Sequence, residues 1–134
     1  MNRYLILSFK GSLRQVPMFR DAIGFEKIYI ACGYTDLRNG IDGLANLIQN
    51  QFHLDPFDKG VLFLFCGKRP DRIKGLLWEG DGFLLLYKRL ENGRFQWPRT
   101  KEELKLMDQE QFVRLMSGYT IESSIKMSSA KYIL

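Results

Sequence analysis

Two turn sequences within residues 72–97 constrain the fold more than any other feature of the chain. The first, Glu79-Gly80-Asp81-Gly82, separates two runs of β-forming residues at 72–78 and 83–90. The second, Asn92-Gly93, is the dipeptide preferred in type I′ hairpin turns and precedes a third run at 94–97. The pattern predicts a three-stranded antiparallel meander, which Pro98 ends.

The segments on either side of this meander predict two more strands and two helices. Residues 27–32 are rich in β-forming side chains, and residues 60–66 form a continuous apolar run, typical of a strand buried on both faces. Apolar residues recur at helical spacing over 36–52, where Thr35 and Asp36 are N-cap candidates. A second amphipathic helix is predicted over 101–117, with Gly118 after it as a stop.

These elements predict an α+β fold: a single domain with a mostly antiparallel sheet, a C-terminal meander, one helix after the first strand and one amphipathic C-terminal helix. The domain spans 27–121, with an N-terminal extension at 1–26 and a serine-rich tail at 122–134. No apolar run approaches the roughly 20 residues that span a membrane. Because Cys32 and Cys66 lack the spacing of a zinc site or a disulfide framework, we expect a cytoplasmic protein without a metal or other cofactor.

The positive charge of the chain is concentrated in and around the meander. The formal net charge is +5, and residues 68–101 hold nine basic and four acidic residues, a surplus as large as that of the whole chain. A local excess of this kind indicates an acidic partner.

The hairpin turns also predict which side chains share a face. A four-residue loop at 79–82 sets Trp78 opposite Phe83 and Arg72 opposite Arg89, and side chains alternate between the two faces along each strand. One face is apolar and faces a core. The other face is basic and polar toward one end, where we expect nucleic-acid contacts from Arg72, Lys74, Tyr87, Arg89, Arg94 and Gln96, joined by Lys68 and Arg69. Its opposite end is apolar and is a candidate partner-binding surface, unless a helix covers it: Leu76, Trp78, Phe83 and Leu85.

Two interpretations of the basic end remain open at this point. Arg72 directly opposite Arg89 is destabilising in an isolated protein, and a bound polyanion would relieve the repulsion. Asp71 and Glu91 are also placed to relieve it, which would leave an ordinary solvated face.

Catalytic motifs are absent from the sequence. Gly67-Lys68 lacks both the glycine spacing and the following Ser or Thr of a phosphate-binding loop. The scattered carboxylates fit caps and turns, and His53 has no nucleophile pattern near it. We therefore expect no catalytic residue, no metal site and no enzyme activity.

Several blocks of the sequence match a known family in order and spacing. They are the run from Cys32 to Ala45, the turn Leu54-Asp55-Pro56-Phe57, the residues Asp71 to Lys74 with Trp78, and the segments Asp81 to Phe83 and Tyr87 to Pro98. In these blocks, which fall within residues 27–121, the chain resembles the TnpB-type accessory protein, the second open reading frame of insertion sequences of the IS66 class.

The resemblance implies a bacterial mobile-element protein that assists a separate transposase and has no established catalytic residue. It draws attention to Thr35, Asp36, Arg38 and Asp42, and to the basic set Arg72, Lys74, Lys88, Arg89 and Arg94. We expect an accessory factor that binds DNA, in particular transposon ends, through the basic face. The alternative is an assembly module that binds the transposase through the apolar end without touching DNA. Residues 1–17 are expected to be an upstream extension without a family role.

Overall fold

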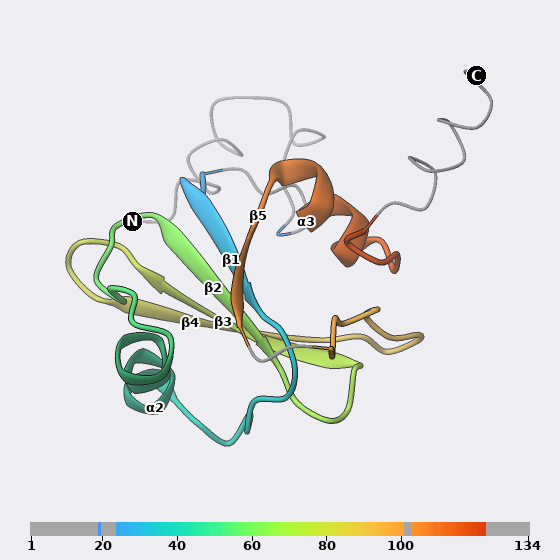
Figure 1. Ribbon diagram of the computed structural model, residues 1–134, viewed down its shortest axis with the longest axis horizontal. Coiled ribbons are helices and arrows are strands. Elements are labelled where there is room, and N and C mark those ends of the chain that lie inside the picture. Colours follow the sequence, from blue (N-terminus) through green and yellow to red (C-terminus); the bar gives the residue numbers. More distant parts are fainter. Residues whose placement is uncertain (1–18, 20–23, 101–102, 123–134) are drawn as a thin grey trace.

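The computed structural model describes residues 19, 24–100 and 103–122 of the chain (Figure 1). The expected extension at 1–17 and the tail from Ser123 lie outside the described residues. None of the helices in the described ranges is long and apolar enough to cross a membrane.

A five-stranded sheet organises the fold, in the order β4-β3-β2-β1-β5 (Figure 1). Its strands are β1 (Lys27–Ala31), β2 (Val61–Cys66), β3 (Arg72–Trp78), β4 (Phe83–Arg89) and β5 (Leu104–Met107). Strands β1 and β2 are parallel and the other three pairings are antiparallel. The predicted α+β class with a mostly antiparallel sheet is confirmed.

Each face of the sheet carries its own core, because the central strand β2 is buried along its whole length. On one face, the helix α2 (Ile41–Asn46) and the π-helical turn η3 (Leu47–Gln51) bring Leu44 and Ile48 against Phe63 and Leu76. On the other face, the helix α3 (Gln109–Met116) packs Phe112 and Leu115 over alternate residues of the same strands. The two helices lie on opposite sides of the sheet in Figure 1.

The β3–β4 hairpin has the register that the turn sequence predicts. Trp78 pairs with Phe83, Lys74 with Tyr87, and Arg72 with Arg89. The four-residue loop therefore sets the pairing of the whole hairpin. This pairing determines which side chains face each of the two cores.

The prediction of a third meander strand at 94–97 is wrong, because these residues form no strand. Instead, the Phe95 N–H donates to the Pro70 carbonyl oxygen at 2.7 Å. Phe95 and Trp97 are buried in the core under α3, and the indole Nε1 of Trp97 donates to the Ala31 carbonyl oxygen at 2.8 Å. Burial of these two rings draws the chain across the end of the sheet and away from β4.

Both predicted helices are shorter than expected. The first begins at Ile41 with Gly40 as N-cap, so neither Thr35 nor Asp36 caps it. The second begins only after Asp108, whose side chain forms a capping box with Gln111.

The preceding residues 104–107 form β5, because the outer edge of β1 needs hydrogen-bonding partners. Gly118 follows α3 with a φ of 91°, and so has the positive φ of a glycine that ends a helix.

Candidate nucleic-acid interface

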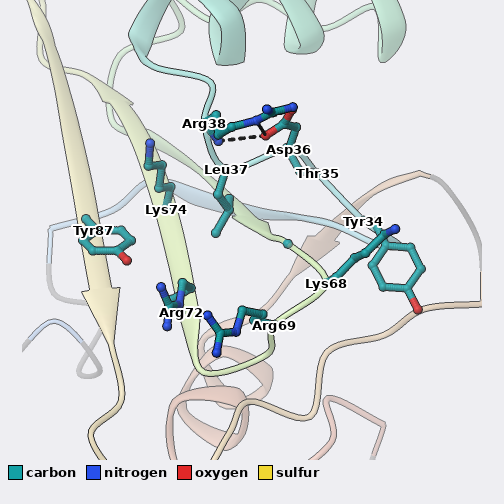
Figure 2. A pocket seen from close by; sticks show the side chains of 11 residues that line it. Tyr34, Thr35, Asp36, Leu37, Arg38, Lys68, Arg69, Arg72, Lys74 and Tyr87 are labelled. Carbon is teal, nitrogen blue, oxygen red and sulfur yellow. Dashed lines mark hydrogen bonds and ion pairs between the residues drawn. The ribbon is translucent and has the colours of Figure 1, made fainter.

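A groove opens at the end of the sheet where β1 and β2 terminate (Figure 2). Its volume is about 840 Å³. We call it the basic groove, and define it by its eleven lining residues: Tyr34, Thr35, Asp36, Leu37, Arg38, Gly67, Lys68, Arg69, Arg72, Lys74 and Tyr87.

The topology of the sheet explains the position of the basic groove. Because β1 and β2 are parallel, the loops that follow them, residues 32–40 and 67–71, leave from the same edge. The Thr35 N–H donates to the Cys66 carbonyl oxygen at 2.9 Å and joins the two loops. Carboxyl ends of parallel strands are where open α/β sheets bind ligands.

Arg99 holds the two loops together from outside the groove lining. Its Nη1 donates to the Gly33 carbonyl oxygen at 2.7 Å, and its Nη2 donates to the Gly67 carbonyl oxygen at 2.6 Å. Its guanidinium also lies 4.2 Å from the centre of the Tyr34 ring, a cation–π distance. Sequence reasoning missed Arg99, because the loops it joins are 66 and 32 residues away and no local pattern marks them.

Two of the groove's arginines are paired with carboxylates. Arg38 Nη2 lies 2.7 Å from Asp36 Oδ2, and Arg72 Nε lies 3.0 Å from Asp71 Oδ1. Hydrogen bonds from the Arg38 side chain and backbone lower the pKa of Asp36 to about 2. Hydrogen bonding from the Arg72 side chain likewise lowers the pKa of Asp71. Both carboxylates are therefore ionised at neutral pH.

The remaining cations differ in how far they are engaged. The Lys74 Nζ donates to the Asn39 carbonyl oxygen at 2.9 Å, which ties β3 to the loop before α2. Lys68 and Arg69 are exposed, and neither side chain forms a hydrogen bond or ion pair within the described part of the chain. Five basic side chains against the carboxylates of Asp36 and Asp71 leave a surplus of three positive charges.

The structure brings together five of the eight residues predicted to contact nucleic acid. Lys68, Arg69, Arg72, Lys74 and Tyr87 all line the basic groove. Arg38, which the resemblance singled out, lines it too.

The other three predicted residues lie outside that lining. Arg89 stands opposite Arg72 but its Nε lies 3.0 Å from Glu91 Oε2. Arg94 and Gln96 are exposed on the segment that replaces the predicted third strand. Since Arg72 and Arg89 each have a carboxylate partner of their own, their repulsion is relieved within the protein.

The predicted partner-binding surface is covered in part. Leu76 is fully buried, and Phe83 and Leu85 pack against the same core, which α2 covers. What remains accessible is an aromatic group in which the ring centres of Trp78 and Phe83 each lie 5.0 Å from that of Phe57. Phe57 is 51% exposed and is the open member of this group.

The groups beside the groove have limited chemistry of their own. Burial raises the pKa of the Cys66 thiol to about 11, and it also raises the pKa of Cys32, so both are protonated at neutral pH. Within the described ranges, no three His, Cys, Asp or Glu side chains gather to form a metal site. The main chemical capacity of the basic groove is attraction for an anion.

Comparison with known proteins identifies relatives of the chain. The sequence model of the family described as "IS66 Orf2 like protein" matches residues 26–126. Two proteins of Sinorhizobium fredii (strain NBRC 101917 / NGR234), uncharacterized proteins y4jC and y4hO, are 36% and 37% identical to the chain over 92 residues. These alignments cover 69% of this chain and 78% and 79% of the two relatives. No solved structure matches the chain. Since the family match covers every strand and helix described above, the chain belongs to the IS66 Orf2-like family of insertion-sequence accessory proteins.

Proposed function

We propose that this accessory protein binds the DNA of its insertion sequence through the basic groove and catalyses no reaction itself. The observation that carries the proposal is the gathering of Lys68, Arg69 and Arg72 in one hollow with a surplus of positive charge. Phosphate oxygens are the acceptors that Arg and Lys side chains most often contact in complexes with DNA.

The pairing of the groove's arginines is compatible with this role. Within the described residues, neither the Lys68 nor the Arg69 side chain has a hydrogen bond or ion pair that a phosphate would have to replace. The Arg38–Asp36 pair is exposed, and exposed ion pairs contribute only about 0–1 kcal/mol, so a phosphate can compete with the carboxylate at low cost. Asp36 and Asp71 each accept a hydrogen bond from the guanidinium group beside them.

Salt dependence and charge reversal test the proposal together. Binding of duplex DNA from the element ends is measured by fluorescence anisotropy at several salt concentrations. About four phosphate contacts would give a slope of about −3.6 in a plot of log K against log salt. The double variant Lys68→Glu/Arg69→Glu is expected to weaken binding and flatten this slope.

The matched control reverses two exposed lysines at the opposite ends of the same strands. Lys27 and Lys59 lie at the amino ends of β1 and β2, and Lys27→Glu/Lys59→Glu changes the net charge by the same amount. Equal binding by the groove variant and the native protein would refute the proposal. An equal loss in both double variants would show that binding depends on net charge alone and would refute the groove as the site.

A second candidate function is assembly with the transposase without DNA contact. It is favoured by the aromatic group of Phe57, Trp78 and Phe83, in which Phe57 is exposed and the other two rings are half-buried. Capture of the transposase in the presence of nuclease, insensitive to salt and lost in Phe57→Asp, would support assembly. Capture that disappears with nuclease treatment would leave DNA binding as the function.

A further inference from the structure

We infer that the basic groove takes unpaired DNA, with one base stacked on Tyr34 and another stacked on Tyr87. The inference rests on the proposed function, because it names the form of DNA that the groove binds. It is carried by two exposed aromatic rings on either side of a row of cations.

The two tyrosines come from different parts of the fold and flank the groove. Tyr34 follows β1 and is 59% exposed, whereas Tyr87 lies in β4 and is 55% exposed. Figure 2 shows the two rings on opposite sides of the groove, with Lys68, Arg69 and Arg72 between them. A strand that crosses the groove would meet an aromatic ring at each side and positive charge along the middle.

The Tyr34 ring and the backbone of Tyr87 are held in place before any ligand arrives. The guanidinium of Arg99 lies over the Tyr34 ring and is itself anchored to two backbone carbonyl oxygens. Tyr87 stands directly opposite Lys74 in the β3–β4 ladder, in the interior of a seven-residue strand. A rigid aromatic side chain loses little conformational entropy on binding, which favours its use as a stacking platform.

The combination of rings and cations fits single strands better than a duplex. In a duplex the faces of the bases are stacked on one another, and only their edges are open to a protein. Unpaired bases can stack on exposed aromatic rings in a basic channel. This stacking contributes to binding and depends little on the base sequence. A volume of about 840 Å³ lies within the range of sites that enclose a small ligand, so the hollow has room for parts of a strand.

The test compares three labelled nucleic acids of equal length at one salt concentration. They are oligothymidylate, its duplex with oligodeoxyadenylate, and oligouridylate. We expect the native protein to bind oligothymidylate about tenfold more tightly than the duplex. Tyr34→Ala and Tyr87→Ala are each expected to weaken oligothymidylate binding by roughly 5- to 100-fold and to leave duplex binding within about twofold.

Two sets of variants control for folding and for general loss of an aromatic ring. Tyr34→Phe and Tyr87→Phe keep the stacking surface and should bind like the native protein. Tyr119→Ala removes a tyrosine that is 60% exposed and also lies under an arginine, Arg114, but is not part of the groove. It should bind every oligonucleotide normally.

The outcomes separate this inference from the proposed function. Equal or tighter binding of the duplex, or tyrosine variants that affect neither form or both forms alike, would overturn the inference. If Lys68→Glu/Arg69→Glu still loses duplex binding in that case, the proposed function is retained and only the inference of unpaired DNA is rejected. Tighter binding of oligouridylate than of oligothymidylate would assign the groove to RNA and overturn both, as would the absence of any binding.

Discussion

Replacing Arg99 with alanine tests how the basic groove is built. The guanidinium joins the loop after β1 to the loop after β2 through Gly33 and Gly67, and it supports the Tyr34 ring. Alanine removes both hydrogen bonds and the cation–π contact together, whereas lysine retains the charge but lacks the planar fork of donors that spans the two carbonyl oxygens.

The magnitude follows from these contacts. Hydrogen bonds to a charged group contribute about 1.5–3 kcal/mol each, and an exposed cation–π contact about 0.5–1 kcal/mol. Arg99 is partly exposed, so water can hydrate the vacated carbonyl groups and the sum is an upper bound. We expect Arg99→Ala to lower the free energy of unfolding by about 2–4 kcal/mol, and Arg99→Lys by about half as much.

Urea unfolding followed by tryptophan fluorescence measures these losses. The matched control is Arg94→Ala, since Arg94 is exposed and makes no hydrogen bond or ion pair within the described residues. We expect the control to change stability by less than about 0.5 kcal/mol. A loss in Arg99→Ala no larger than that of the control would refute the reasoning that this side chain holds the two loops together.

Three further predictions concern the frame of the site. Leu76 lies in the core under α2, so Leu76→Ala should lower the free energy of unfolding by about 2–5 kcal/mol in urea. The Leu84 side chain is 39% exposed, so Leu84→Ala should lower it by less than about 1 kcal/mol. Equal losses in the two variants would contradict the difference in burial. Gly60→Ala should destabilise by more than about 1 kcal/mol, because Gly60 has a φ of +81° and an added Cβ would lie 2.8 Å from Glu26 Cγ; Gly82→Ala, with open space around it, is the control and should be nearly neutral. The lowered pKa of Asp36 means that folding favours its ionised form, so this stabilisation is complete above about pH 4 and is lost as the pH falls toward 2. Between pH 6 and pH 2.5, the free energy of unfolding should fall less in Asp36→Asn than in the native protein. An equal fall in both proteins would show that ionised Asp36 does not stabilise the fold.

Local turn chemistry explains why the hairpin could be predicted in detail. The loop at 79–82 connects strands that are adjacent in sequence, so its length sets the pairing of Trp78 with Phe83 and all pairs beyond it. The continuous apolar run of β2 likewise predicts burial on both faces, which the structure confirms.

The sequence predicted two segments wrongly because interactions between distant residues determine their structure. Residues 104–107 carry a helical pattern but pair with β1, which lies more than 70 residues earlier in the chain. Residues 94–97 follow a favourable hairpin dipeptide, yet Trp97 reaches the Ala31 carbonyl oxygen and its ring is buried under α3. In both segments tertiary hydrogen bonding and burial outweighed local propensity.

The candidate site was accessible to sequence reasoning only in part. Arg72, Lys74 and Tyr87 share a face because strand alternation places them there, and that could be calculated from the turn. Tyr34 and Arg99 belong to segments without a regular period, and only the folded chain brings them to the groove.

The sequence by itself determined the hairpin register, the buried central strand, the local excess of positive charge and, through its ordered motifs, the family. These properties depend on neighbours in the chain or on composition, and so they can be read without a fold. The tertiary structure decided that α2 covers Leu76 at the apolar end of the hairpin and that the cations surround a hollow. Both depend on the parallel pairing of β1 with β2, which brings two distant loops to one edge of the sheet.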